Sequence, residues 1–142
     1  MTLLLPRAIL REIRQHVEDG YPNEVCGFLI GDWDGKGSER AAKRVRRAPN
    51  TVEGSKRTRF VIHPRELIAL EDELEGSGQQ ILGFYHSHPD YPAAPSRFDE
   101  EHAWPWYSYI VASVVNGKFG HATSWILRED RSTFDEETLV VK

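Results

Sequence analysis

The segment from Val25 to Trp33, VCGFLIGDW, is a nearly continuous run of apolar residues in a chain that is 28% charged overall. A run of this kind is typical of a β-strand that is buried on both faces, because a strand with one wet face alternates apolar and polar residues. Such a strand needs partner strands at its edges and further layers over its faces. The run therefore predicts the interior strand of a covered sheet.

The rest of the chain alternates between helical and strand patterns. Helical spacing of apolar residues runs from Leu5 to Asp19, and Pro64 opens a second helix that ends near Gly76. A short third helix is expected from about Arg97 to Trp104. A strand pattern covers residues 25–33, and after a turn in GDWDGKGSE a more polar strand runs through Val45. Further strand patterns cover residues 59–64, 79–88, 107–115, 118–127 and 133–141. Asn116-Gly117 predicts a hairpin turn between two of them. This order predicts an α/β fold in which a single mixed sheet is flanked by helices.

Composition and length place the chain among ordinary globular proteins. Its 142 residues fit one domain, residues 1–142, with 39% hydrophobic residues for a core. Eighteen lysines and arginines against 22 aspartates and glutamates give a formal net charge of −4, so we expect neither a nucleic-acid nor a membrane partner. The apolar start is broken by Pro6 and Arg7, and the only cysteine, Cys26, lies in an apolar run and is assigned to packing. We therefore expect a cytoplasmic protein without disulfides.

Two histidines, His86 and His88, stand one residue apart at the end of the strand pattern QQILGFYHSH. Alternate side chains of a strand share a face, so the two imidazoles project the same way from Cα atoms about 6.6 Å apart. A catalytic zinc ion usually takes three protein ligands and keeps a further position for water. Asp99 lies beyond a loop of seven residues that separates His88 from Ser96, which is long enough to bring the carboxylate back to the strand end. These residues are candidates for a two-histidine, one-carboxylate metal site.

Simpler explanations exist for the same residues. Ser96-Arg97-Phe98-Asp99 also fits a capping box, in which Ser96 closes the start of a helix and Asp99 is favoured by the helix dipole. Alternating histidines in a strand can face solvent or form ordinary hydrogen bonds. Taken separately, these patterns favour the structural explanation, and only their joint spacing favours a metal site.

The remaining histidines offer weaker cases. The chain has neither H-E-x-x-H nor P-C-x-x-C, which excludes two other zinc-hydrolase patterns. His102 with Glu100 and Glu101 would provide substitute ligands, but a solvated helix face explains these three better. His63 and His121 look like strand-end or loop residues and receive no chemical role.

The pattern His86-x-His88, seven residues, Ser96, two residues, Asp99 resembles the signature of the JAMM (MPN+) metalloprotease family, whose members remove ubiquitin or ubiquitin-like proteins. Upstream, NEVCGFLIG is similar to the family's Glu-x-Cys-Gly-x-Leu-x-Gly segment and places Glu24 where the family has its catalytic glutamate. RAPN before RFVIHP is also similar to the family. The resemblance implies the cytidine-deaminase-like JAMM/MPN fold within the α/β class.

The resemblance also implies a role for each residue. One zinc ion with a bound water would be held by His86, His88 and Asp99. Glu24 would take a proton from the water and return it to the leaving amine, and Ser96 would donate a hydrogen bond to the oxyanion. Because the Ser96 hydroxyl would then be needed for catalysis, we expect its helix cap to be weak or absent.

The compact chain is similar to stand-alone prokaryotic members, which act on ubiquitin-like sulfur-carrier proteins that end in Gly-Gly. The implied reaction is hydrolysis of the amide bond after that Gly-Gly, in a narrow groove that only residues without bulky side chains can enter. A deubiquitinase-like isopeptidase that acts on conjugates and a non-catalytic MPN-type interaction scaffold remain alternatives, and a homodimer is left open. The loop DYPAAP and the aromatic run WPWYSY are candidates for the groove wall, although packing explains the aromatic run better. The basic stretch KRVRRA is interpreted as an edge strand that its charges protect from pairing with other chains.

Overall fold

The computed structural model describes residues 1–33, 35, 37 and 39–142. Over these residues it contains the helices α1 (Arg7–Gly20), α2 (Pro64–Leu74) and α3 (Arg97–His102). The strands are β1 (Thr2–Leu5), β2 (Cys26–Asp32), β3 (Glu39–Ala48), β4 (Gln80–Pro89), β5 (Ser108–Val115), β6 (Lys118–Leu127) and β7 (Phe134–Val141). The turn expected in GDWDGKGSE falls partly on residues 34, 36 and 38, which lie outside the described residues. No helix in the described part of the chain is long and apolar enough to span a membrane.

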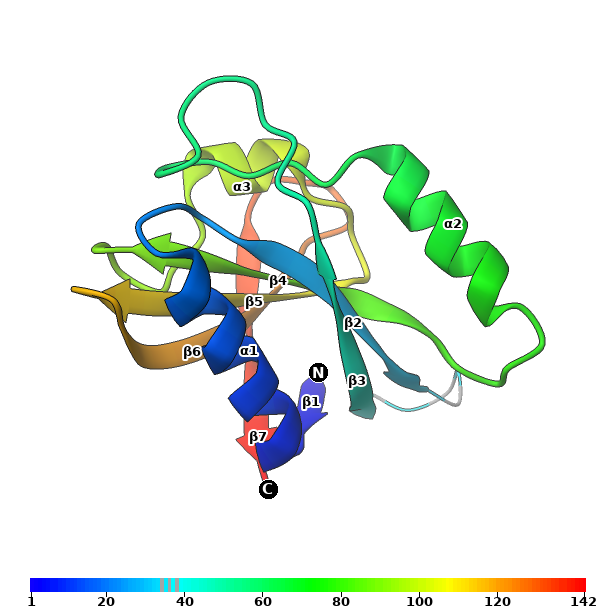
Figure 1. The fold of residues 1–142 in the computed structure, drawn as a ribbon. Coiled ribbons are helices and arrows are strands. Elements are labelled where there is room, and N and C mark those ends of the chain that lie inside the picture. Colours follow the sequence, from blue (N-terminus) through cyan, green and yellow to red (C-terminus); the bar gives the residue numbers. More distant parts are fainter. Residues whose placement is uncertain (34, 36, 38) are drawn as a thin grey trace.

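The strands form one mixed sheet in the order β1-β3-β2-β4-β5-β6-β7, which closes into a barrel (Figure 1). The pairs β1/β3, β1/β7 and β4/β5 are parallel and the others are antiparallel. The mixed sheet confirms the predicted fold class. Its closure was not predicted, because it depends on β1, four residues that precede the first helix and that the sequence pattern did not reveal as a strand.

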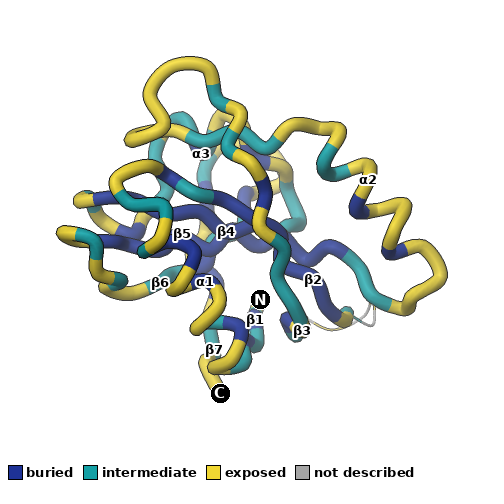
Figure 2. Tube along the Cα trace, in the orientation of Figure 1, coloured by how far each residue is buried: buried dark blue, intermediate teal, exposed yellow. Residues whose placement is uncertain are grey.

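Strand β2 is buried on both faces, as its apolar sequence predicts. Leu29 belongs to one core cluster together with Ile13 and Val17 of α1. Phe28, on the opposite face, belongs to a second cluster together with Leu70 of α2. Helices α1 and α2 therefore cover different faces of the sheet, and the strands between them are the most buried part of the molecule (Figures 1 and 2).

The segment RFVIHP, expected as a strand, has no regular secondary structure over residues 59–63, and Pro64 begins α2, so this prediction is wrong. Its one backbone pairing to the preceding loop runs from Thr51 N to Val61 O, 2.9 Å away. The apolar pattern arises because Phe60, Val61 and Ile62 line a pocket rather than a sheet face.

By contrast, the hairpin turn at Asn116 and Gly117 is confirmed, and both residues have the positive φ values (50° and 82°) that a tight two-residue turn requires.

The basic stretch in β3 lies beyond the part of the strand that pairs with β1, which reaches only Ala41. All three of its arginines pair with acidic residues of neighbouring helices: Arg44 and Arg46 with Glu73 of α2, and Arg47 with Asp19 of α1. The charged half of β3 thus lies at an edge of the barrel wall, as the interpretation of KRVRRA expects.

Arg40 of β3 and Glu137 of β7 form a buried ion pair, with side chains that are both 0% exposed and 3.4 Å apart. Arg40 also donates to the backbone oxygen of Trp106, 2.7 Å away. Ser108 and Ser124 each donate to Oε1 of Glu137 over 2.7 Å. This polar network connects β3, β5, β6 and β7.

Candidate metal centre

Strand β4 carries both histidines of the predicted site. It pairs with β2 on one side and β5 on the other, so His86 lies between Cys26 and Val111. The two imidazoles project from the same face of β4 and are almost completely buried. Their Nε2 atoms are 3.1 Å apart.

Asp99 reaches the same point from the first turn of α3. Its Oδ2 atom lies 3.1 Å from Nε2 of His86 and 3.2 Å from Nε2 of His88. Each residue is fixed by a different element, because the histidines belong to a central strand and the carboxylate to a short helix after the proline-rich loop. The structure therefore brings together the three residues that the sequence analysis grouped as candidate ligands.

The hydrogen bond on the other side of His88 indicates what this cluster can hold. Nδ1 of His88 lies 2.8 Å from the carbonyl oxygen of Pro92, and a carbonyl only accepts, so Nδ1 carries the proton. In the neutral ring, Nε2 then presents a lone pair towards the carboxylate of Asp99. Two acceptors that face each other at 3.2 Å inside a buried site are poorly matched unless a cation lies between them.

His86 fits the same requirement. Burial lowers the pKa of His86, more than the neighbouring Asp99 raises it, so the ring favours the neutral form that binds metals. Its Nδ1 atom is buried and has no hydrogen-bond partner among the described residues. Two imidazole nitrogens and one carboxylate oxygen are ligand types that suit zinc.

Ser96 and Asp99 form a complete capping box at the start of α3. Oγ of Ser96 accepts from the backbone N–H of Asp99 over 3.1 Å, and Oδ2 of Asp99 accepts from the backbone N–H of Ser96 over 2.8 Å. The expectation of a weak or absent cap is therefore wrong. The reasoning failed because a hydroxyl that accepts through a lone pair still has its own proton to donate.

The pKa of Asp99 shows that its surroundings favour the carboxylate. Burial opposes ionisation, but positive charge on His86, hydrogen bonds that His86 and His88 donate when protonated, and the backbone N–H of Ser96 together hold the pKa of Asp99 well below its usual value. The side chain is thus a carboxylate at neutral pH, as a metal ligand must be.

Glu24 lies two residues before β2 and is 2% exposed. One ligand atom from each of Glu24, His86, His88 and Asp99 can be chosen so that all four lie within 4.8 Å of one another. Burial, and secondarily the charge of Asp99, raises the pKa of Glu24 to about 9. Oε1 of Glu24 is buried without a hydrogen-bond partner in the described part of the chain.

Ser87, the residue between the two histidines, holds the backbone next to Glu24. Its backbone N–H donates to Val25 O over 3.1 Å, and its Oγ accepts from Val25 N over 2.9 Å. Because the side chain of Ser87 points away from the histidine face, it can hold the neighbour of Glu24 while the histidines face the cluster. The sequence analysis did not assign Ser87 a role.

Tyr91 and Phe60 are two further residues that the sequence analysis missed. The ring of Tyr91 stacks on His88 with centroids 4.1 Å apart, and its hydroxyl donates to Oε2 of Glu24. The ring of Phe60 stacks on His86 with centroids 4.3 Å apart. The available signal was the position of Tyr91 in DYPAAP, a loop already expected to shape the site. Phe60 gave no such signal, because it was read as part of a strand.

The other histidines lie outside the cluster. His102 stacks on Phe98 one turn earlier in α3, His63 caps α2 by accepting from the backbone N–H of Arg65, and His121 contacts Ser113. Cys26 is fully buried, and burial raises the pKa of its thiol to about 12, with a smaller contribution from Glu24. It is therefore a packing residue and not an activated thiol.

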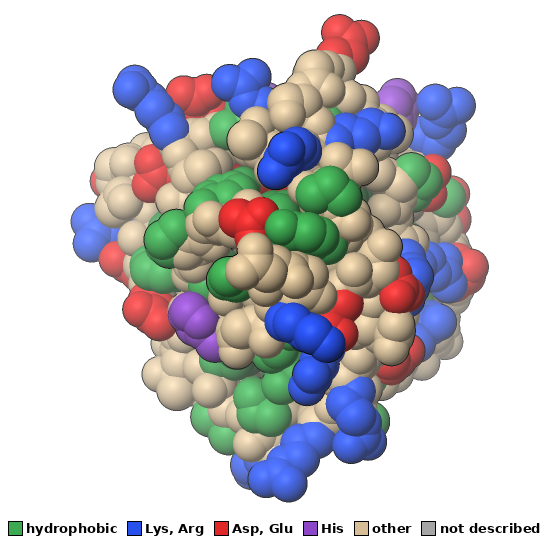
Figure 3. Space-filling model, turned by 60° about the vertical axis from the view of Figure 1, so that its left-hand side comes forward, with side chains coloured by type: hydrophobic (Ala, Val, Ile, Leu, Met, Phe, Trp, Pro, Cys, Tyr) green, Lys and Arg blue, Asp and Glu red, His purple; other side chains and the backbone are tan. Residues whose placement is uncertain are grey.

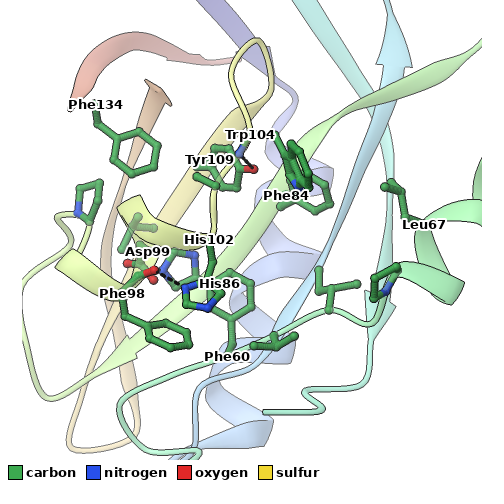
Figure 4. A pocket seen from close by; sticks show the side chains of 16 residues that line it. Phe60, Leu67, Phe84, His86, Phe98, Asp99, His102, Trp104, Tyr109 and Phe134 are labelled. Carbon is green, nitrogen blue, oxygen red and sulfur yellow. Dashed lines mark hydrogen bonds and ion pairs between the residues drawn. The ribbon is translucent and has the colours of Figure 1, made fainter. Parts of the chain in front are cut away.

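A pocket of about 240 Å³ opens beside His86 and Asp99. Its wall is mainly aromatic and aliphatic, and the close-up in Figure 4 shows Phe98 beside Asp99 and His86, and Trp104 beside Tyr109 and Phe84. The lining also includes Phe60, Leu67 and Phe134, from three different parts of the chain. Trp104 is 60% exposed, and its backbone N–H is held by the hydroxyl of the buried Tyr109, 2.8 Å away. The aromatic run thus supplies both packing and a pocket wall.

The fold is that of a JAB-type domain, and comparison with known families agrees. Residues 6–128 match the family described as prokaryotic homologs of the JAB domain. The chain belongs to this family.

Several named proteins have sequences similar to most of the chain. A desampylase of Pyrococcus furiosus is 32% identical, with 99% of this chain and 91% of the relative covered. A desampylase of Haloferax volcanii is 36% identical over 75% of this chain and 73% of its own length. A probable TtuB-protein conjugate cleaving protease of Thermus thermophilus is 34% identical over 78% of this chain and 70% of its own length.

Solved structures share the fold. The solution structure of a protein from Desulfitobacterium hafniense has a TM-score of 0.83 and 32% identity, with 100% of this chain and 93% of that chain covered. A protein from Salinibacter ruber gives a TM-score of 0.73 and 35% identity, with 100% and 92% covered.

Proposed function

We propose that this protein is a zinc-dependent peptidase that hydrolyses the amide bond after the C-terminal Gly-Gly of a ubiquitin-like carrier protein. The observation that carries the proposal is the convergence of His86, His88, Asp99 and Glu24 within 4.8 Å, beside an apolar pocket. The names of the relatives, two desampylases and a probable conjugate cleaving protease, support an enzyme of the JAMM type with a ubiquitin-like partner.

In this proposal His86, His88 and Asp99 hold one zinc ion. When bound, the ion would polarise the attacking water and the scissile carbonyl and would lower the pKa of Glu24. The hydrogen bond from Nδ1 of His88 to Pro92 O keeps the Nε2 lone pair directed at the site. The capping box does the same for Asp99 by fixing its carboxylate in the first turn of α3.

Glu24 is the proposed general base. Its Oε1 atom has no other partner in the described residues, so it is available to accept a proton from the attacking water and to pass it to the leaving amine. Oε2 is held by the Tyr91 hydroxyl, which restricts rotation of the carboxylate. Because burial raises the pKa of Glu24 to about 9 without a metal ion, the charge of the bound ion would be needed to keep this carboxylate ionised at neutral pH.

Ser96 is the proposed oxyanion donor. Its oxygen accepts the N–H of Asp99, and this leaves its proton free to be donated towards the carbonyl oxygen of the substrate. The helix cap therefore uses a lone pair of the Ser96 oxygen, and the proposed catalytic role uses its proton.

The apolar pocket is the proposed site for a side chain of the partner's tail that precedes the Gly-Gly. Two glycines allow the backbone to approach the buried cluster closely, and a preceding apolar residue would fill the space between Phe98 and Trp104. On the face shown in Figure 3, hydrophobic side chains gather around an acidic one, with basic side chains around them, which suits a protein partner. Neither nucleic acid nor a membrane has a part in this proposal. It also requires no dimer, because all four clustered residues come from one chain.

Two alternatives differ in what they predict. An isopeptidase that acts on conjugates would use the same residues and would differ only in the leaving amine, which belongs to a lysine. A non-catalytic scaffold is disfavoured by the complete cluster of buried ligand types.

The test combines metal analysis with product analysis. Wild type and His88→Ala are analysed for metal content, and each is incubated with a ubiquitin-like carrier extended by two residues beyond Gly-Gly, with and without chelator. We expect about one zinc per wild-type chain, little in the variant, and chelator-sensitive release of the extension seen by mass spectrometry. Cleavage only of the same carrier joined to a lysine side chain would favour the isopeptidase. A folded wild type without bound metal would contradict the proposal.

A further inference from the structure

Asn50 lies near the start of the loop between β3 and α2, and its side-chain amide forms four hydrogen bonds. Nδ2 donates to Glu24 O over 3.1 Å and to Arg59 O over 3.0 Å. Oδ1 accepts from the backbone N–H groups of Val52 and Val61, each over 3.1 Å. The amide therefore has both donor hydrogens and both acceptor positions occupied, and it connects three segments of chain.

One of these segments contains Glu24. This residue lies before β2, so no strand ladder holds its peptide groups. Its N–H donates to Lys56 O over 2.6 Å, and its C=O accepts from Asn50. Both backbone groups of the proposed base are thus fixed by the loop that contains Asn50.

A second segment contains Phe60. Asn50 binds the residues on either side of it, Arg59 and Val61, and the Phe60 ring stacks on His86 at an interplanar angle of 24°. A single side chain consequently connects the backbone of Glu24 with the residue that covers His86.

We propose that Asn50 is a positioning residue that fixes the Glu24 carboxylate relative to the histidine cluster, acting through the backbone of Glu24. The inference rests on the proposed function, in which Glu24 is the general base. Proton transfer needs the base within hydrogen-bond reach of the attacking water, and small displacements of a catalytic group have large effects on turnover. Ser87 holds the neighbouring Val25 from the side of β4, so Glu24 is held between two independent contacts.

The test needs a variant that removes the hydrogen-bond donors of the Asn50 side chain and keeps an acceptor. Asn50→Asp keeps an acceptor for Val52 and Val61 and loses both donor bonds, including the one to Glu24. Thr51→Val is a matched control, because Thr51 Oγ1 donates to Val61 O over 3.1 Å in the same loop. The control removes one loop hydrogen bond without touching the contact between Asn50 and Glu24. Asn50→Ala serves as a second variant in case the new carboxylate disturbs folding.

The experiment measures kcat and KM separately on the Gly-Gly-extended carrier, together with zinc content. It also follows amide hydrogen exchange of Glu24 by NMR on metal-free protein. For Asn50→Asp we expect kcat to fall about tenfold to hundredfold with KM within about twofold, zinc content unchanged, and faster exchange at Glu24. For Thr51→Val we expect kcat within about twofold of wild type and no change in exchange at Glu24.

Equal kcat values in Asn50→Asp and Thr51→Val, or a loss of zinc in parallel with kcat, would overturn the positioning role. A wild type that binds zinc but cleaves neither the extended carrier nor the lysine conjugate would instead overturn the proposed function, and this inference with it. Because the wild type is measured in the same assay, the two failures are distinguishable.

Discussion

Ser96 and Asp99 bind each other reciprocally across the first turn of α3, with the backbone N–H of Ser96 2.8 Å from Oδ2 of Asp99 and the backbone N–H of Asp99 3.1 Å from Oγ of Ser96. Oδ2 of Asp99 is also the atom that faces both histidines. The start of the helix and the candidate metal centre are therefore one structure, and changes at either residue should affect both stability and activity.

Ser96→Ala should lower both the free energy of unfolding and the turnover. Loss of the cap should reduce the free energy of unfolding by about 1 kcal/mol, and loss of the oxyanion donor should reduce kcat by about 10²-fold or more. Urea denaturation and steady-state kinetics measure the two effects. Ser96→Thr, which keeps a hydroxyl, is the control and should retain most of both. A loss of stability in Ser96→Ala with unchanged kcat would leave Ser96 with the cap alone.

Glu24→Gln should retain zinc and lose turnover. The amide is nearly the same shape as the carboxylate but cannot accept a proton, so kcat should fall by about 10²-fold to 10⁴-fold. Glu53→Gln, a change at an exposed loop residue, is the control. Zinc-dependent hydrolysis at the wild-type rate in Glu24→Gln would show that another group is the base.

Tyr91→Phe should move the acid limb of the pH profile of kcat/KM to higher pH. The Tyr91 hydroxyl donates to Oε2 of Glu24, and a donated hydrogen bond favours the ionised carboxylate, so its removal should raise the pKa of Glu24. We expect a shift of about half a pH unit or more, while the stacking on His88 is kept. Tyr107→Phe, at a ring that packs against Phe84 instead, should leave the profile in place. An identical profile in both variants would rule out an effect of Tyr91 on the base.

Arg40→Met and Glu137→Met should each be strongly destabilising alone and less so together. Either single change leaves a buried charge without its partner, which typically lowers the free energy of unfolding by about 3 to 5 kcal/mol. In the double variant both charges are absent, so the total loss should be smaller than the sum of the single losses. Urea denaturation of the three variants measures this coupling, and simple additivity would contradict it.

The stability of the protein should fall as the pH decreases from about 6.5 to about 4 because of His16. Burial, and then the charge of Arg47, lowers the pKa of His16 to about 4, more than Asp19 raises it. The folded state therefore binds a proton less readily than the unfolded state. The contribution is fully present above pH 6.5 and is lost towards pH 4, up to about 3 kcal/mol.

The matched variant for this prediction is His16→Gln, which keeps a polar partner for the hydroxyl of Tyr85, 2.7 Å from Nδ1 of His16. Urea denaturation of both proteins at pH 7.5 and pH 4.5 isolates the effect, because all other titrating groups are shared. The difference in free energy of unfolding between the two pH values should be smaller in the variant. The same difference in both proteins would show that His16 does not titrate in this range.

Local sequence determined much of the fold and the core of the candidate site. The apolar run in β2 reported burial on both faces, and the alternation in β4 placed His86 and His88 on one face, because the period of a strand is fixed by backbone geometry. The number of residues between His88 and Asp99 makes the connecting loop long enough to bring the carboxylate back to the histidines. These features depend on residues close together in the chain, so pattern and spacing are sufficient to predict them.

Only the tertiary structure decided the rest. The closure of the barrel by β1 depends on partners at residues 39–41 and 138–141, far along the chain. The contacts of Tyr91 and Asn50 with Glu24 join residues 67 and 26 positions apart. Each of these contacts forms because folding brings a loop against a strand end, and a buried polar group takes whichever donor or acceptor is placed beside it. The sequence by itself was sufficient to predict the candidate metal ligands, whereas only the folded chain showed which side chains position them.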